Sequence, residues 1–526
     1  MQNLIIDNAL ILDGSGSPPF QGVVCIKNNK IKHISKTTPP TFESKRVIDA
    51  EGMMLTPGFI DPHGHSDISI LAAPEATGKI SQGITTEVCG NCGLSVFPIT
   101  GNNREHLQEL FNHYNVDISW STFAEYAKCV EDAGPAINIA SLCGHNTLRA
   151  AVSGYEKKQL TSCELRRMEK LHRESIEQGA AGTSTGLLYV PGQFANFAEL
   201  TVLGKTVANS AEIFTSHLRS EGKKLLEAID EFIAIAEKTG IKHIHISHFK
   251  TAGKSNWHKL EDALLRISQA KERGIYITAD RYPYIESMTQ LSAYMPSPYS
   301  EMDDIKLKDH LSNSANFAEF IESVNNEFSE NEWSGKRVVS TGSPLIPPAL
   351  FGQTFDTISA NLAITPAEIC AELLRDDAPG TMGASMGMSE SNMIKILTQP
   401  FVCCATDESA RPADYSIGRS HPRGFGSFPQ FIKLLLPYLP IEEIIRKMTS
   451  LPAQIFNIRK RGMIKEGYFA DLVLLDPAKI ADSEFANFAD PHKLAPGIKK
   501  VWVNGELAYC NTSKIDKRSG IFLRND

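Results

Sequence analysis

Short apolar runs alternate with longer amphipathic segments along most of the chain. We count eight such runs rich in β-forming residues, among them "GITTEVCGNCG", "KHIHISHFK" and "PFVCCATDES". Helix-like segments separate most of them, and in residues 222–240 the apolar side chains recur at helical spacing. Strand and helix that alternate eight times predict an α/β fold, a (β/α)8 barrel of the TIM type.

Both ends of the chain carry a different pattern, in which short strands are separated by turn residues. "NLIIDNALILDG" near the start and "IKKVWVNGELAYC" near the end are of this kind. We therefore predict one small β-rich domain, a sandwich, built from residues 1–57 and 460–526, with the barrel over residues 58–459. Residues 286–345 are interpreted as an insertion after the seventh barrel strand, where an insertion can act as a lid.

Composition and charge narrow the possible partners. The chain has 526 residues, of which 42% are hydrophobic, and its 61 acidic residues outnumber 53 basic ones, a net charge of −8. Because no dense run of Lys or Arg occurs, we expect neither nucleic acid nor a membrane as partner. The start has no basic leader, and ten cysteines are too dilute for a disulfide framework. A cytoplasmic protein with reduced thiols is expected.

Side chains that bind metals or move protons stand at the ends of the predicted barrel strands. In chain order, they are His63, His65, Cys92, His145, His217, His248, Asp280 and Asp407. Barrels of this type build their active sites at this end of the strands. Since His63 and His65 are two residues apart, both point to one face and can bind one ion. Cys92, His217 and His248 can bind a second ion or share the first, in a set suited to zinc.

Several nearby residues have a simpler explanation. Cys89 and Cys92 form a C-x-x-C motif, but no second such motif occurs, so Cys89 is expected to pack in the core. His243 and His245 each lie an odd number of residues before His248, so on a regular strand they point to the opposite face from that predicted ligand. We therefore expect them to face the helix layer. Two roles stay open for His145: support of a metal ligand and contact with the substrate.

Eight motifs together resemble one known family. They are "LTPGFIDPHGHSD", "GNCG", "GTSTGLLYVPG", "TSHLR", "ISHFK", "DRYPY", "TDES" and "SHPRGFGSFP". Over nearly the full chain the sequence resembles the N-acyl-D-amino-acid deacylases (D-aminoacylases) of the amidohydrolase superfamily. The resemblance implies a zinc-dependent hydrolase that cleaves the amide bond of N-acyl-D-amino acids. It also implies one tightly held zinc ion, with a second, weaker one beside it.

The resemblance also implies roles for individual residues. The implied metal ligands are His63, His65, Cys92, His217, His248 and Asp407. Asp407 would also be the general base and acid, and Arg423 would bind the substrate carboxylate. Tyr282, preferred over Tyr284, would touch the same carboxylate, and Met388 would line the side-chain pocket.

Two other functions compete with this one. The first is another amidohydrolase reaction, on cyclic amides or dipeptides, but such relatives bridge two metals with a lysine after strand four, where this chain reads "GTSTGLLY". The second is a scaffold of the same fold without catalysis, which is disfavoured because all the ligand-type residues are retained.

Overall fold

The eight predicted barrel strands lie in two parallel sheets in the computed structural model, which describes residues 3–36, 46–210 and 212–525. The strands are β6 (Phe59–Asp61), β7 (Ile84–Cys89), β8 (Asn138–Ser141) continued by β9 (Cys143–Gly144), β10 (Gly182–Gly186), β11 (Ile213–His217), β12 (His243–Ile246), β13 (Tyr276–Arg281) and β17 (Val402–Cys404). A parallel bridge between Gly64 and Glu408 joins the last strand to the first. The predicted (β/α)8 barrel is confirmed.

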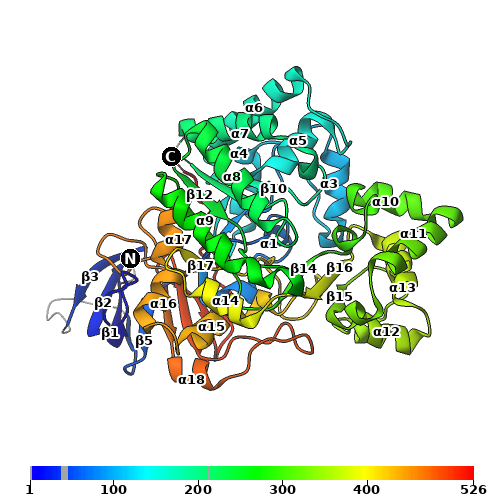
Figure 1. The fold of residues 1–526 in the computed structure, drawn as a ribbon. Coiled ribbons are helices and arrows are strands. Elements are labelled where there is room, and N and C mark those ends of the chain that lie inside the picture. Colours follow the sequence, from blue (N-terminus) through cyan, green and yellow to red (C-terminus); the bar gives the residue numbers. More distant parts are fainter. Residues whose placement is uncertain (1–2, 37–45, 211, 526) are drawn as a thin grey trace.

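Helices surround the barrel strands (Figure 1). The longer ones are α4 (Phe123–Ala133), α5 (His145–Ser153), α6 (Ser162–Glu177), α7 (Phe197–Ser210), α8 (Leu225–Thr239), α9 (Leu260–Glu272), α14 (Glu390–Leu397), α15 (Arg423–Leu435) and α16 (Ile441–Met448). The apolar stripe of α8, including Leu225, Ile229 and Phe232, is buried as its spacing predicts. Among the described residues, no helix combines the length and the apolar character needed to cross a membrane.

A separate sheet draws its strands from both ends of the chain. It runs in the order β20-β19-β18-β5-β1-β2-β3, with β4 paired to β1. Its strands are β1 (Asn3–Ile11), β2 (Phe20–Lys27), β3 (Lys30–Ser35), β4 (Arg46–Asp49), β5 (Met54–Pro57), β18 (Leu472–Leu475), β19 (Ile498–Val503) and β20 (Glu506–Cys510). Ile6, Val24 and Trp502 are buried together in its own apolar core. The β-rich unit is thus present, while the predicted domain boundaries stay a prediction.

The chain leaves the barrel after β13 and forms an insertion, which lies at the right of Figure 1. Its elements are β14 (Glu286–Gln290), α10 (Asp304–Leu311), α11 (Ser314–Glu327), β15 (Lys336–Ser340), α12 (Phe355–Leu362), α13 (Pro366–Asp377) and β16 (Met382–Met386). Strands β14 and β16 pair antiparallel, so the chain returns beside the place where it left. The insertion has its own apolar core and continues past residue 345.

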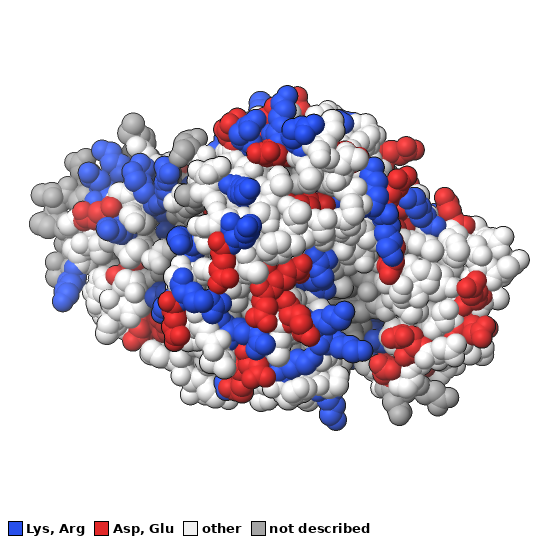
Figure 2. Space-filling view, turned by 45° about the horizontal axis from the view of Figure 1, so that its top comes forward, with Lys and Arg blue, Asp and Glu red and all other residues white. Residues whose placement is uncertain are grey.

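Besides several 3₁₀ helices, five short α-helices are also present in the described residues. They are α1 (Ser69–Ala72), α2 (Thr77–Ile80), α3 (Arg104–Leu110), α17 (Ser450–Ile455) and α18 (Pro477–Asp482). On the face shown in Figure 2, acidic and basic side chains are interspersed over much of the surface. This mixture accords with the modest net charge of −8.

Candidate metal centre

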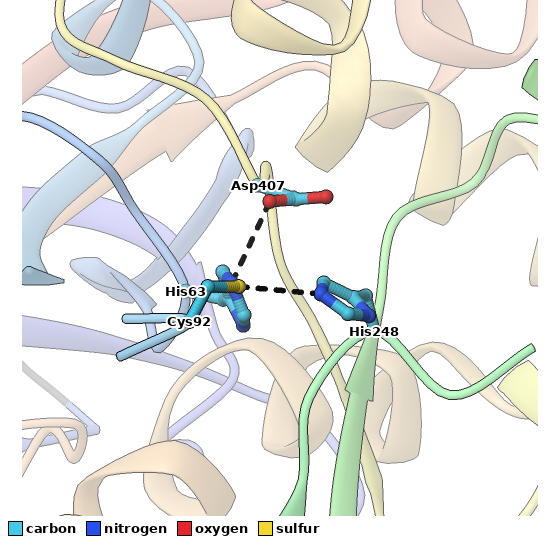
Figure 3. Close-up of side chains that lie close together, drawn as sticks. All are labelled: His63, Cys92, His248 and Asp407. Atoms are coloured by element: carbon cyan, nitrogen blue, oxygen red, sulfur yellow. Dashed lines mark hydrogen bonds and ion pairs between the residues drawn. The ribbon is translucent and has the colours of Figure 1, made fainter. Parts of the chain in front are cut away.

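Cys92 lies between two imidazoles that come from other strand ends. Its Sγ is 3.3 Å from His63 Nε2 and 3.3 Å from His248 Nε2. Figure 3 shows these three side chains converging with Asp407. One possible ligand atom from each of the four residues lies within 4.8 Å of the others. Nitrogen, sulfur and carboxylate oxygen are the donors that zinc takes in proteins, so this group fits a zinc ion.

A second group of possible ligands adjoins the first through His248. It contains His217, Glu221 and His248, and the rings of the two histidines are 4.4 Å apart. Both ring nitrogens of His217 are buried, and within the described residues neither makes a hydrogen bond of ordinary geometry. Because a buried polar atom without a partner is costly, the orphaned nitrogens fit a site in which a metal ion completes the set.

Asp407 connects the H-x-H motif to the wall of a cavity. Its Oδ1 is 3.1 Å from His65 Nε2 and 3.5 Å from His63 Nε2. Its other oxygen, Oδ2, is 2.9 Å from Arg423 Nη1. The carboxylate is therefore placed between the candidate metal ligands on one side and a buried guanidinium on the other.

Three of these residues have a left-handed backbone. The φ angles are +52° at Cys92, +36° at His248 and +52° at Asp407. This conformation costs free energy for a residue with a side chain, and such strain is concentrated at functional sites. Here it turns each side chain at the point where its strand has ended.

The electrostatics favour an ionised thiol at the centre. Burial alone would raise the pKa of Cys92, but the imidazoles of His63 and His248 more than offset this and hold it well below its usual range. Burial likewise acts to raise the pKa of Asp407, while Arg423 and His248 hold it well below the ordinary value. Two anionic ligand groups are thus available at neutral pH.

A buried carboxylate, Asp280, and a partly buried one, Glu221, orient the imidazoles from behind. Asp280 Oδ2 is 3.0 Å from His63 Nδ1, and Asp280 Oδ1 accepts the backbone N–H of His248 at 2.9 Å. Glu221 Oε1 lies 2.7 Å from His248 Nδ1. A carboxylate behind a ligating histidine fixes its tautomer and ring orientation. Glu221 was missed in the sequence, although it follows His217 by four residues, and Asp280 was noted without this role.

The expectation that His243 and His245 face the helix layer is wrong for His245. Its Nε2 lies 2.9 Å from Asp280 Oδ2, the same oxygen that contacts His63. The argument from alternating side-chain directions fails because β12 ends at Ile246. His248 has a positive φ and lies beyond the regular strand. Alternation cannot be counted through that turn.

A cavity of about 800 Å³ opens in front of these groups. Among the residues on its wall are His65, Cys92, His217, His248, Lys250, Tyr282, Asp407 and Arg423. The Arg423 guanidinium lies 4.6 Å from the centre of the Tyr282 ring, and the buried Tyr282 hydroxyl makes no hydrogen bond within the described residues. A guanidinium and a free hydroxyl on one wall can together bind a carboxylate.

The cavity wall does not include every residue singled out in the sequence. Met388 is absent from it and its Sδ accepts a hydrogen bond from Arg281 Nη2 at 2.9 Å. His145 Nε2 lies 2.8 Å from Glu199 Oε1, and His145 too is absent from the wall. The role of Met388 stays a prediction, as do the roles of the other named residues. Lys250, whose Nζ is 2.8 Å from His248 Nδ1, was not singled out in the sequence.

Comparisons with known proteins bear on this geometry. A family model described as the amidohydrolase family matches residues 46–330 and 435–509. The N-acyl-D-glutamate deacylase of Alcaligenes xylosoxydans xylosoxydans is 31% identical over 530 residues, covering 100% of this chain and 97% of that protein. The D-aminoacylase of the same organism is 29% identical, covering 96% and 93%.

A solved structure of a related protein matches the fold of this chain over nearly its whole length. The crystal structure of N-acyl-D-glutamate deacylase from Bordetella bronchiseptica, complexed with zinc and a phosphonate inhibitor that mimics the reaction's tetrahedral intermediate, superposes with a TM-score of 0.81. It is 28% identical, and the match covers 99% of each chain. The chain therefore belongs to the amidohydrolase family, among its N-acyl-D-amino-acid deacylases.

Proposed function

We propose that the protein is a zinc-dependent hydrolase that cleaves the amide bond of N-acyl-D-amino acids to a carboxylate and a free D-amino acid. The observation that carries the proposal is the position of Cys92 Sγ, 3.3 Å from both His63 Nε2 and His248 Nε2. Beside it, the pair of Asp407 and Arg423 lines the same cavity. The deacylase names of the relatives support the reaction and the D configuration.

The residues that would hold the metal are His63, His65, Cys92, His217, His248 and Asp407. The thiolate character of Cys92 and the orphaned ring nitrogens of His217 support this set. When bound, zinc lowers the pKa of a water ligand to about 7 and polarises a carbonyl group. One tightly held ion, with a second, weaker one, is part of the proposal.

Asp407 is proposed to move the proton. Its pKa is held well below the ordinary value by Arg423 and His248 in spite of burial, so its carboxylate is ionised at neutral pH and can accept a proton from the attacking water. It then returns that proton to the amino group as the C–N bond breaks. Its contact with His65 Nε2, at 3.1 Å, keeps Oδ1 directed at the candidate metal ligands.

Arg423 and Tyr282 are proposed to bind the substrate's α-carboxylate. Arg423 is 2% exposed and Tyr282 fully buried, so a carboxylate that reached them would leave bulk water. A charge-assisted, bidentate contact of this kind fixes orientation as well as affinity. It would hold the scissile amide beside Asp407, and orientation of reacting groups lowers the barrier substantially.

We also place the reaction in the cytoplasm as part of the proposal. All ten cysteines are free thiols in the structure, five of them on or beside the barrel strands at Cys89, Cys92, Cys143, Cys403 and Cys404. Free thiols are ordinary in a reducing compartment.

The test is a matched substrate screen of the zinc-loaded protein. Pairs of N-acetyl-D- and N-acetyl-L-amino acids with acidic, apolar and basic side chains are assayed beside a cyclic amide. We expect release of the free amino acid from D substrates only. Turnover of the cyclic amide with none of the D series would overturn the proposal.

A further inference from the structure

A buried ammonium group, that of Lys79, lies behind the H-x-H motif. Lys79, on α2, has 0% of its side chain exposed and is one of the largest fully buried side chains of the protein. Its Nζ donates to Asp61 Oδ2 at 2.8 Å, to Thr406 Oγ1 at 2.7 Å and to the Glu408 carbonyl at 2.7 Å. An ammonium has three N–H donors, so all of them are used.

Its partners belong to two segments that meet only in the folded chain. Asp61 Oδ1 accepts the backbone N–H of His63 at 3.2 Å and that of Thr406 at 3.0 Å. The Glu408 carbonyl also accepts the N–H of His65 at 3.1 Å. The ammonium therefore lies at the seam between residues 61–65 and 406–408. This seam is also where the last barrel strand joins the first.

The charge of Lys79 is compensated within the same cluster. Glu87 Oε2, from β7, is 3.3 Å from Nζ, and the same oxygen accepts a hydrogen bond from Ser66 Oγ at 2.8 Å. Burial lowers the pKa of Lys79, but Asp61 and Glu87 more than offset this and hold it above the usual range. Burying an ammonium is expensive, and an apolar side chain of similar length would fill the space without that cost. Packing alone therefore does not explain a charged residue at this position.

We propose that Lys79 is a positioning residue that sets the spacing of His63 and His65 relative to Asp407, and through it the affinity of the centre for metal. The three residues lie on the two segments that the ammonium joins. The Asp407 N–H donates to the His63 carbonyl at 2.8 Å, so a separation of the segments would move the ligands apart. The inference rests on the proposed function and deepens it.

The test compares Lys79→Met with Arg461→Met. Arg461 is also a buried cation, 3% exposed, paired with Asp471, and it does not line the cavity. Both variants are freed of metal and titrated with Co²⁺, whose thiolate absorption band reports binding at Cys92. We expect Lys79→Met to lose at least about tenfold in cobalt affinity, the scale seen when outer partners of metal ligands are removed. Arg461→Met should lose thermal stability and keep wild-type cobalt affinity.

Turnover supplies a second readout. With metal saturating, kcat of Lys79→Met should fall at least about tenfold while KM, set by Arg423 and Tyr282, changes less than about threefold. Wild-type cobalt affinity in Lys79→Met overturns the proposal. The proposal is also overturned if Arg461→Met loses as much cobalt affinity as Lys79→Met does while its thermal midpoint falls by the same amount. Because cobalt binding needs no substrate, this result stands apart from any failure of the deacylase assignment.

A milder pair of variants covers the case in which Lys79→Met does not fold. Thr406→Val removes one acceptor of the ammonium and keeps every charge, whereas Thr406→Ser keeps the hydroxyl. We expect Thr406→Val to weaken cobalt binding about threefold or more and Thr406→Ser to restore it. Equal cobalt affinity in Thr406→Val and the wild type would overturn the proposal by itself.

Discussion

Arg423 Nη1 lies 2.9 Å from Asp407 Oδ2, so the guanidinium proposed to bind the substrate carboxylate already faces a carboxylate of the protein. Both residues are buried, Arg423 at 2% and Asp407 at 7% exposed. A substrate carboxylate that binds Arg423 would share this guanidinium with Asp407. On the proposed roles, this arrangement links recognition of the substrate by Arg423 to proton transfer by Asp407.

Arg423→Met tests the recognition half of this link. Loss of a buried charge-assisted contact should raise KM for N-acyl amino acids about tenfold or more, the equivalent of roughly 1.4 kcal/mol. The control is an N-acyl amine without the α-carboxylate. Its kcat/KM should change little between the two proteins, and a parallel loss on both substrates would remove Arg423 from carboxylate binding.

Asp407→Asn tests the proton-transfer half. The amide cannot accept the proton, so kcat should fall by about 10²- to 10⁴-fold, the usual contribution of a positioned acid or base. Zinc content should stay near the wild-type value because Cys92 and the histidines remain. Metal analysis of the purified variant therefore separates the two roles; an inactive protein that had also lost its zinc would show Asp407 acting mainly as a ligand.

Glu221→Gln tests the carboxylate behind His248. Glu221 Oε1 is 2.7 Å from His248 Nδ1, and weakening such a contact should lower zinc affinity about 10- to 100-fold. Competition with a chelating dye measures the affinity. Glu237→Gln is the matched control, since Glu237 is an exposed partner of Arg273, and it should bind zinc as the wild type does. Equal affinities in both variants would count against a role for Glu221.

Metal binding should release protons. Burial lowers the pKa of His65, but the hydrogen bond to Asp407 and the Cys92 thiolate more than offset it and raise the pKa to about 10. In His248, burial and Lys250 lower the pKa, while Glu221 and Cys92 raise it to about 9. Both imidazoles are therefore protonated at pH 7 in the metal-free protein, and a ligand must lose its proton to bind.

The sign of the pH dependence follows directly. Zinc affinity should rise as the pH rises from 6 to 9, by up to about tenfold per pH unit for each proton released, and fall in acid. Calorimetric titrations in two buffers of different ionisation heat count these protons, and we expect roughly one to two per ion. An affinity independent of pH over this range would show that the imidazoles are neutral before the metal binds.

The sequence was sufficient to predict the barrel and the residues at its rim. Eight apolar runs separated by helical patterns give the strand order, and the H-x-H spacing puts His63 and His65 on one face. Because strands of a barrel end at one rim, Cys92 and His248 could be expected to meet although they are 156 residues apart.

Other features depend on geometry that no local pattern reports. His245 contacts Asp280 from within the regular strand, whereas the backbone leaves that strand before His248, so alternation counted from His248 misplaces His245. The contact of Lys79 with Thr406 spans 327 residues and exists only when the end of the last barrel strand lies beside the first. In the sequence, a lysine on a short helix is indistinguishable from an exposed one.

The most direct test of the account is removal and return of the metal. The protein is dialysed against a chelator until no metal remains, and hydrolysis of an N-acetyl-D-amino acid is measured before and after stoichiometric zinc, in the wild type and in Cys92→Ala. The account predicts no measurable turnover without metal, recovery with about one zinc ion per chain, and no recovery at that zinc level in Cys92→Ala. Full activity of the metal-free wild type would contradict it.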